Sequence, residues 1–342
     1  MTWKVNIDAV RAGERIALAR TISQVEDQTS AGRQALSALF PFSGQAHLIG
    51  ITGSPGTGKS TLTAQLARIF RHPQTGEKPQ RVGILAIDPT SPFSGGAVLG
   101  DRVRMRDLAG DDGIFIRSMA SRGALGGLSA ATAAVATVLD AAGYGVILIE
   151  TVGAGQDDVE IVRLAHTTIV VEAPDLGDEV QAIKAGILEI ADILVLNKAD
   201  LPGVARAERA LRSALELADA SRPFSADAGH HRDQNKVPDA APMTWRPPLI
   251  KTIATTGQGA IELYKSVMDH KQYLSIDNRW ESKNSARLAS ELEHHLRESL
   301  FTGWQKGIDP QVYRQALSDV LSHKVHPQQA ALDLIKQPKS SK

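Results

Sequence analysis

The sequence predicts an α/β fold in which a mostly parallel β-sheet carries helices on both faces. Three observations predict it: short apolar runs that alternate with helical patterns, a glycine-rich turn between the first run and a helix, and helical patterns at both ends of the chain. The runs are HLIGIT (47–52), VGILAID (82–88), GVILIE (145–150), TTIVVEA (167–173), DILVLN (192–197) and PPLIKTIA (247–254). Ligands of such a sheet bind at the carboxyl ends of its strands.

Residues 1–42 are predicted to form an N-terminal helical arm. Apolar residues recur there at mostly helical intervals, with charged residues between them and little strand signal. The residues of this pattern are Val10, Ile16, Leu18, Ile22, Val25, Leu36 and Leu39. The main domain is predicted to follow at 43–270.

The turn after the first apolar run has the spacing of a phosphate-binding loop, which makes the predicted fold that of a P-loop NTPase. Its sequence, GSPGTGKST, fits G-x-x-x-x-G-K-[ST] and stands between a predicted strand and a predicted helix, as the motif requires. Backbone N–H groups and the helix N-terminus surround phosphate oxygens in such a loop. The residues expected to bind nucleotide are Gly53, Ser54, Pro55, Gly56, Thr57, Gly58, Lys59, Ser60 and Thr61. We expect Lys59 to neutralise the β and γ phosphates and Ser60 to bind Mg²⁺.

Acidic residues near strand ends are the candidates for the remaining Mg²⁺ ligands. Asp88 ends the second run, Asp101 stands in LGDRVRM, and Glu150 ends the third run. A carboxylate at the end of a parallel strand faces the nucleotide edge and suits a hard cation. A turn cap is the structural alternative for Asp88, and a surface ion pair with a neighbouring arginine is the alternative for Asp101.

The segment that begins at Glu150 is the candidate switch. Common GTPases carry Asp-x-x-Gly there, whereas this chain has Glu150 and Gly153. The longer glutamate still reaches a metal-bound water, and the N–H of Gly153 is placed to sense the γ-phosphate. No Gln follows Gly153 directly, and Gln156 comes three residues later. A standard water-positioning glutamine is therefore not expected, and hydrolysis is predicted to be slow without a partner.

The run that ends in NKAD predicts guanine as the base. A carboxylate at Asp200 would accept two hydrogen bonds from N1–H and the 2-amino group of guanine, whereas adenine offers no such donor edge. Lys198 is expected to cover the base with its alkyl stem, and Asn197 to tie this loop to the phosphate loop. The later stretch TIATTGQG (252–259) resembles the final base-contacting loop of GTPases. The residues expected to contact the base there are Ile253, Ala254 and Thr255, with the Ala254 backbone amide bonded to guanine.

The remainder of the chain is predicted to hold a loop insertion at 221–243, a C-terminal helical arm at 271–335 and a disordered tail at 336–342. Leu288, Leu292, Leu296, Leu300 and Trp304 recur every four residues. A second stripe comprises Val312, Ala316, Leu317, Val320 and Leu321. Such stripes face either the core of the same chain or a second subunit, and the pattern alone leaves both readings open.

Composition excludes several classes of partner and site. The 342 residues include 38 Lys plus Arg, 38 Asp plus Glu and no Cys. Balanced charge argues against nucleic acid as a partner, and the lack of cysteine excludes disulfides and thiolate sites. The chain has no long uncharged span and starts without a signal-like apolar run. We therefore expect a cytoplasmic protein with no membrane partner.

Taken together, five stretches resemble the MeaB/ArgK family of GTPases over roughly residues 10 to 310. They are GITGSPGTGKST, DPTSPFSGGAVLGDRVRM, IETVGAGQ, DEVQAIKAGILEIADILVLNKAD and WRPPLIKTIATTGQG. The resemblance implies a GTP/GDP-binding chaperone of an adenosylcobalamin-dependent acyl-CoA mutase, methylmalonyl-CoA mutase above all. It also implies cofactor loading from an adenosyltransferase and a homodimer joined through the helical arms.

Further site residues follow from this resemblance. Asp88, Asp101 and Glu150 match the Mg²⁺ and switch acids of the family, and Asp175 to Lys184 match an additional switch that contacts the mutase. Lys184 is the candidate for a cation that the mutase brings toward the phosphates, with an ordinary surface lysine as the alternative. Catalytic roles are thus expected for Lys59, Asp101, Glu150 and Lys184.

Three other functions share parts of this pattern. A GTPase that delivers metal to a nickel enzyme would need a Cys or His cluster, and the chain has no Cys and no His-rich tract. A small-molecule or protein kinase would use the phosphate loop, but Asn-Lys-x-Asp predicts guanine, and a protein kinase would show a different lysine and catalytic loop. A non-hydrolysing scaffold is disfavoured by the intact Lys59 and Ser60.

Overall fold

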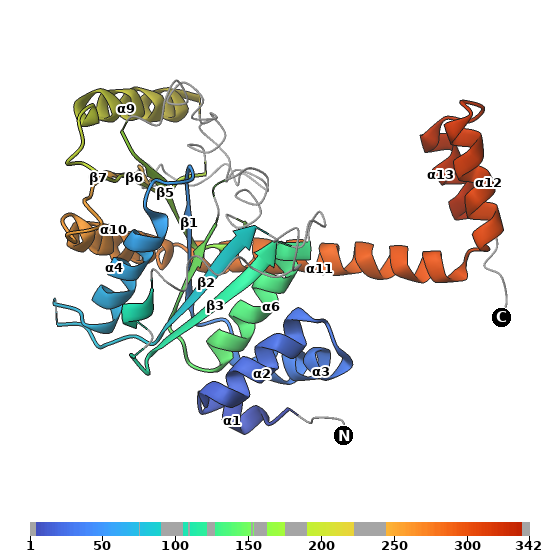
Figure 1. The fold of residues 1–342 in the computed structure, drawn as a ribbon, viewed down its shortest axis with the longest axis horizontal. Helices are drawn as coiled ribbons and strands as arrows, with labels where there is room; N and C mark the ends of the chain where they lie inside the picture. The colour runs from blue at the N-terminus through green and yellow to red at the C-terminus, as the bar shows by residue number, and fades with distance from the viewer. Residues whose placement is uncertain are drawn as a thin grey trace, which may run out of the picture. The chain divides into compact units, whose positions relative to one another are not determined.

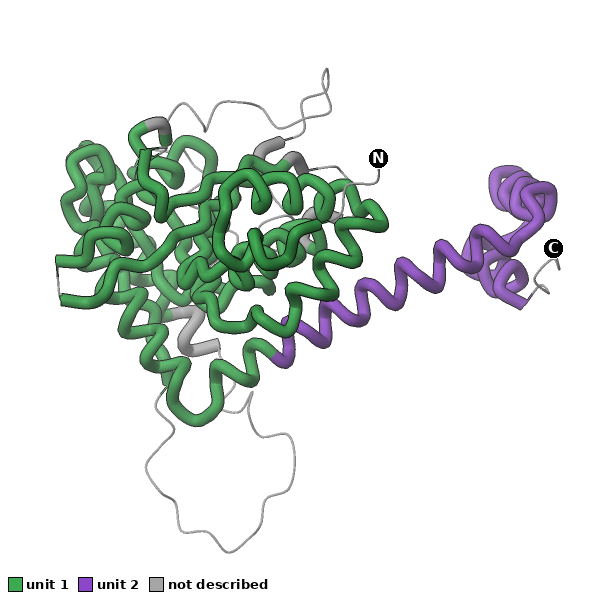
Figure 2. The backbone as a smooth tube through the Cα atoms, turned by 90° about the horizontal axis from the view of Figure 1, so that it is seen from below, with its two compact units in different colours: residues 1–284 green, residues 285–342 purple. Residues whose placement is uncertain are grey.

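The computed structural model describes residues 5–74, 76–89, 105–108, 110–121, 127–151, 153, 163–174, 190–221 and 244–336. The chain divides into two compact units, Met1–Asn284 and Ser285–Lys342, which Figure 2 shows in green and purple. Residues 222–243 of the predicted insertion and 337–342 of the predicted tail lie outside the described residues.

The first unit is built on a seven-stranded sheet in the order β3-β2-β4-β1-β5-β6-β7, and every adjacent pair is parallel (Figure 1). The strands are β1 (His47–Thr52), β2 (Val82–Pro89), β3 (Ile114–Ser121), β4 (Val146–Glu150), β5 (Thr167–Glu172), β6 (Ile193–Leu196) and β7 (Leu249–Lys251). The residues of β1 and β4 are all buried, as is typical of parallel strands covered by helices on both faces. The predicted fold class is confirmed.

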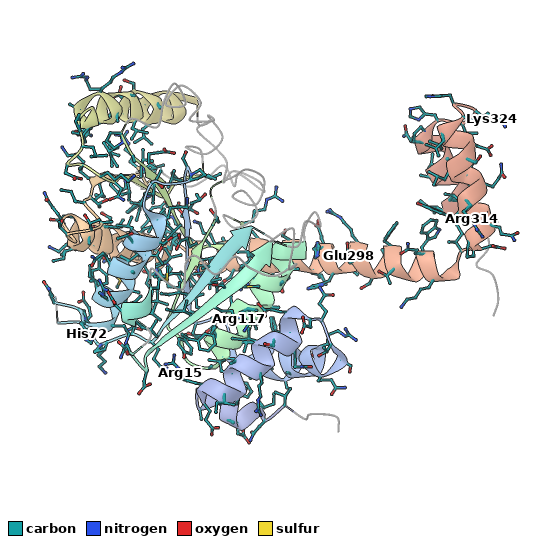
Figure 3. The ribbon with its side chains drawn as sticks, viewed as in Figure 1. Arg15, His72, Arg117, Glu298, Arg314 and Lys324 are labelled. Carbon is teal, nitrogen blue, oxygen red and sulfur yellow. The ribbon has the colours of Figure 1, made fainter. Side chains whose placement is uncertain are left out.

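One edge strand, β3, was not among the predicted strands. Its sequence IFIRSMAS breaks the apolar run with Arg117 and Ser118, which hides the strand pattern. The structure explains the arginine, which Figure 3 labels. Its guanidinium pairs with Glu26 and donates to Ser23 at 3.2 Å, both on α2. An ion pair with a covering helix therefore stands where the pattern predicts an apolar residue.

Helices cover both faces of the sheet. One face packs against α4 (Lys59–Arg71) and α10 (Ala260–Leu274). The other packs against α6 (Gly127–Ala141) and α9 (Val204–Ser221), with α1 (Ile7–Arg11), α2 (Arg15–Glu26) and α3 (Ser30–Leu39) beside α6. A short 3₁₀ turn at Phe40–Phe42 follows α3, and another, at Arg106–Leu108, lies between β2 and β3 in the sequence. The apolar side chains between these layers form the core.

The N-terminal helices use their apolar stripe to cover α6. Leu18, Ile22 and Leu39 are fully buried in the cluster that also holds Val138 of α6. Ile16, a member of the predicted stripe, is 69% exposed and lies outside this cluster. The helical pattern thus correctly identified the buried face, except at this position.

The second unit is helical. It contains most of α11 (Arg279–Gly307), followed by α12 (Pro310–Leu321) and α13 (Pro327–Lys336). Along α11, Leu292, Leu296 and Leu300 are 61%, 51% and 71% exposed, so this stripe is not part of a core of the described chain. The indole N–H of Trp304 donates to the Leu334 carbonyl at 3.4 Å and joins α11 to α13. No helix within the described residues combines the length and apolarity needed to cross a membrane.

Candidate nucleotide-binding site

The sheet brings those predicted site residues that the structure describes to its carboxyl edge. Residue Ile51 near the end of β1 lies opposite Glu150 at the end of β4, and Glu150 in turn lies opposite Ala86 of β2. Asp88 follows two residues later in β2, so its backbone belongs to the same edge. Because all strands run in one direction, β6 and β7 also deliver the segments that follow them to this edge.

The phosphate loop occupies the turn between β1 and α4, where glycine is required by the backbone. Gly53 has φ +135° and Gly58 has φ +94°, values that favour glycine. A Cβ on Gly53 would collide with the Val171 carbonyl of β5, and one on Gly58 would collide with the Asn197 amide. The loop can therefore pack this closely against β5 and the Asn197 side chain only with glycine at both positions. Helix α4 begins at Lys59, so its N-terminus faces the loop.

Lys59 and Ser60 are both buried in the loop. The Lys59 ammonium donates to the carbonyls of Gly53 and Ser54 at 2.8 and 3.0 Å. Ser60 Oγ donates to Glu150 Oε1 at 2.5 Å, which joins the phosphate loop to the end of β4. Glu150 is only 4% exposed. The structure thus places a hydroxyl and a carboxylate, two oxygen donors suited to a hard cation, in direct contact.

Gly153 lies against the phosphate loop. Its φ of +82° is in the left-handed region, and a Cβ built on it would collide with the Gly53 carbonyl and stand 2.8 Å from Lys59 Nζ. The backbone at residue 153 therefore lies this close to Gly53 of the phosphate loop only because it has no side chain.

Asn197 joins three segments of the site. Its Nδ2 donates to the Thr57 carbonyl of the phosphate loop at 2.7 Å. Its Oδ1 accepts from Thr252 Oγ1 at 2.9 Å and from the Ala254 N–H at 3.0 Å. The side chain is 2% exposed, so all three bonds are shielded from water. The link between Asn197 and the phosphate loop that the sequence predicts is present.

The other predicted base-contacting residues line the same edge. Lys198 is half-buried with φ +55°, and the N–H of Ala199 donates to the Thr252 carbonyl at 3.0 Å. Asp200 and Thr255 are exposed, and Ile253 is half-buried. Asp200 is thus accessible to a ligand at the point where the loops after β6 and β7 meet.

The Ala254 N–H has a partner that the sequence did not predict. It donates to Asn197, whereas the sequence-based expectation was a bond to guanine. The backbone amide of Ala254 bonds within the protein because Asn197 points Nδ2 toward the phosphate loop and Oδ1 toward the 252–254 segment. A bond from this amide to guanine requires the N–H to be shared or released by Asn197.

Two residues of this site were missed by sequence reasoning. Thr252 bonds to Asn197, and its place at the start of the stretch TIATTGQG was the available signal. Gln65 of α4 donates from Nε2 to the Ala254 carbonyl at 3.0 Å. Nothing in the sequence pattern marks Gln65, because the contact joins residues 189 positions apart.

Several predicted residues lie outside the described part of the chain. These are Asp101, Gln156, Lys184, the segment 175–184 that contains it, and the side chain of Asp88.

Comparison with known proteins gives a consistent result. The family model described as methylmalonyl Co-A mutase-associated GTPase MeaB matches residues 18–307. A putative GTPase of Pyrococcus horikoshii is 42% identical over 287 residues, covering 84% of this chain and 83% of the relative. The GTPase ArgK of Escherichia coli is 30% identical over 334 residues, covering 95% and 93%. A crystal structure described as LAO/AO transport system kinase superposes with a TM-score of 0.68 and 26% identity, covering 96% of this chain and 95% of that one.

Proposed function

This chain belongs to the MeaB family of GTPases, and from that membership we propose that it is a Mg²⁺-dependent GTPase that acts as a chaperone of an adenosylcobalamin-dependent acyl-CoA mutase. The client is methylmalonyl-CoA mutase or a close relative. The observation that carries the proposal is the match of the mutase-associated GTPase model over residues 18–307, which includes the phosphate loop and the Asn197 to Asp200 segment.

Phosphate binding is assigned to the loop from Gly53 to Thr61. Loop N–H groups and the α4 N-terminus offer partial positive charge to the phosphates. Lys59 now donates to two loop carbonyls at 2.8 and 3.0 Å, and it turns to the β and γ phosphates when nucleotide enters. Lys59 would thereby neutralise the negative charge that develops on the phosphates as the bond between the β and γ phosphates breaks. This stabilisation, in a water-poor site, lowers the barrier to GTP hydrolysis.

The donor set fits Mg²⁺. Ser60 Oγ and Glu150 Oε1 are buried oxygen atoms 2.5 Å apart, and carboxylate and hydroxyl oxygens are the ligands that this ion prefers. Ser60, Glu150, Asp88 and Asp101 are the residues proposed to hold it, directly or through water. When bound with the nucleotide, Mg²⁺ would neutralise part of the negative charge of the phosphates.

Guanine selection is assigned to Asp200, with Lys198 over the base and Ile253 to Thr255 at its edge. Asn197 fixes this region against the phosphate loop through its bond to Thr57 at 2.7 Å. The exposed carboxylate of Asp200 is open to the N1–H and 2-amino donors of guanine, and an adenine ring has no matching donor edge. This selection favours a GTPase over an ATP-dependent kinase.

Partner control is proposed for the switch segments. Gly153 already touches the phosphate loop, so movement of the segment after β4 alters the surroundings of Lys59. A mutase that engages the segment 175–184 would bring Lys184 toward the phosphates, with Asp101 completing the metal side, and so raise the slow basal turnover. The same cycle gates cofactor transfer from an adenosyltransferase. The protein is proposed to work as a cytoplasmic homodimer.

The enzymatic part of the proposal is tested by hydrolysis of GTP and ATP by the purified chain, with Mg²⁺ and with EDTA. We expect hydrolysis of GTP only, and only with Mg²⁺. Lys59→Ala should lower kcat/KM for GTP by about 10²-fold or more, because a charge that meets the phosphates in a water-poor site is lost. Arg68→Ala, an exposed position three residues beyond Gln65 on α4, is the control and should hydrolyse GTP normally. Preference for ATP would contradict the proposal.

A further inference from the structure

We propose that Gln65 is a positioning residue for the base-contacting loop and controls how long a guanine nucleotide stays bound. The inference rests on the proposed GTPase function and extends it to a residue outside the nucleotide-binding motifs. Gln65 lies on α4, half-buried, and its Nε2 donates to the Ala254 carbonyl at 3.0 Å.

Ala254 is held from two sides. Its N–H donates to Asn197 Oδ1 at 3.0 Å, and its carbonyl accepts from Gln65. The residue is 4% exposed, so water cannot easily replace either partner. Loss of Gln65 would leave a buried carbonyl without its side-chain donor while the bond to Asn197 remained.

These bonds close a ring around the nucleotide-binding edge. Asn197 bonds to Thr57 of the phosphate loop and to Ala254 of the base loop. Gln65 bonds to the same Ala254 from α4, the helix that follows the phosphate loop. The N–H of Leu62 on this helix donates to the Gly58 carbonyl of the phosphate loop at 3.0 Å. Two connections therefore hold the phosphate loop and the base loop at a set distance: one through the Asn197 side chain and one through α4.

Thr252 and Ala254 bond to Asn197, but the bonds that residues 253–258 make with one another are local, so Gln65 supplies a second anchor from a different element. The N–H of Ile253 donates to the Gln258 carbonyl and the N–H of Gly257 to the Ile253 carbonyl, both at 3.0 Å. Such bonds fix the shape of the turn but not its position relative to the phosphates. A nucleotide contacts both loops at once, so its residence time depends on how firmly their spacing is held.

The test measures dissociation of a fluorescent GDP analogue from the full chain. Gln65→Ala removes the donor, and Gln65→Glu keeps the side-chain shape but places a carboxylate against the carbonyl. We expect both variants to release the analogue about fivefold faster, the size expected for one lost hydrogen bond. Gln65→Lys retains a donor and should stay within about twofold of the unmodified chain. Arg68→Ala, an exposed residue one turn further along α4, should release it at the unmodified rate.

Inorganic pyrophosphate separates positioning from general damage, because it contacts only the phosphate loop. Its affinity, measured by competition, should be unchanged in Gln65→Ala, and the KM for GTP should rise while kcat stays within about twofold. An unchanged GDP release rate in Gln65→Ala would overturn the inference and leave the proposed function intact. Equal weakening of pyrophosphate and GDP would overturn it as well. Failure of the unmodified chain to bind GDP would instead refute the proposed function and this inference with it.

Discussion

At the scale of single residues, Asn197 organises the site. One amide side chain donates to the phosphate loop and accepts from two groups of the 252–254 segment, all within 3.0 Å. It leaves Asp200, three residues later, exposed to a ligand. Structural and recognition roles are thus divided between neighbouring residues of one motif, so they can be tested separately.

Substitution of Asp200 tests base selection. Asp200→Asn replaces one acceptor oxygen by an amide donor, which no longer matches the N1–H and 2-amino donors of guanine but does match xanthine, whose C2 carries an oxygen. We expect GTP affinity to fall about 10²-fold or more and XTP binding to appear, measured by competition against labelled GDP. Because Asp200 is exposed, the free energy of unfolding should change by less than about 0.5 kcal/mol. Unaltered selectivity for GTP would remove Asp200 from the base site.

Some residues of the candidate site could be predicted from the sequence and others could not. Lys59, Ser60 and Asn197 stand in motifs whose spacing reflects local chemistry. The first two are buried in the phosphate loop, and Asn197 bonds to that loop at Thr57. Gln65 carries no such mark, because its role arises from a contact with Ala254 across 189 positions. Partners of this kind depend on helix packing, which residue spacing does not encode.

At the scale of elements, the opposite end of β1 holds a buried histidine network in the first unit. Thr167 Oγ1 joins His47 Nε2 at 2.7 Å to His270 Nδ1 at 2.9 Å. His270 Nε2 lies 3.3 Å from Asp192 Oδ1, which favours a proton on Nε2. His166 stacks on Trp280 with centroids 4.0 Å apart. The network ties the starts of β1, β5 and β6 to α10 and the beginning of α11.

This network predicts loss of stability in mild acid. Burial lowers the pKa of His270 to about 4, against the attraction of Asp192, and lowers the pKa of His47 well below its usual value, with the nearby charge of His166 adding to it. In the unfolded chain both histidines titrate near pH 6.5. The unfolded state therefore binds more protons below this pH, so the stabilisation is complete above pH 6.5 and is lost as pH falls toward 4.

The free energy of unfolding should fall by roughly 1.4 kcal/mol per pH unit for each of these two histidines below pH 6.5. Urea denaturation at intervals from pH 7 to pH 5 measures it. His270→Phe should reduce this slope by about half, whatever its effect at pH 7. His295→Gln, a substitution of an exposed histidine outside the network, should leave the slope unchanged. A slope that His270→Phe does not alter would exclude the network as its origin.

Elements were predicted where their pattern was uniform. The six apolar runs all became strands. In β1, β4 and β6 every residue is buried, and burial on both faces leaves a continuous apolar signal, whereas the edge strand β7 is only partly buried. Strand β3 was not predicted because Arg117 interrupts its apolar run. The ion pair between Arg117 and Glu26 of α2 cannot be inferred from residue spacing, because it forms only when the N-terminal helices pack in the folded chain.

At the scale of the whole molecule, the described residues include an exposed apolar stripe along α11. Leu292, Leu296 and Leu300 are each more than half exposed within a helix that carries charged residues between them. Exposed apolar patches of this kind are typical of association surfaces. The stripe is the surface on which we expect the proposed homodimer to form.

Charge placed on this stripe should separate the subunits. In Leu292→Glu/Leu296→Glu, each subunit would bury two carboxylates at a two-fold interface, so we expect a monomer at concentrations where the unmodified chain is a dimer. Sedimentation velocity gives the mass of each species. Glu298→Gln, a substitution of an exposed residue on the same helix, should remain dimeric. Dimerisation of the double variant with unchanged affinity would place the interface elsewhere.

We propose that a mutase controls the nucleotide site of this chain. The most direct test is the rate of GTP hydrolysis with Mg²⁺, measured for the chain alone and with each available adenosylcobalamin-dependent acyl-CoA mutase, with ATP as the control nucleotide. We predict slow hydrolysis of GTP alone, stimulation of at least about tenfold by one mutase, and no hydrolysis of ATP. A GTPase whose rate no mutase alters would contradict the chaperone proposal.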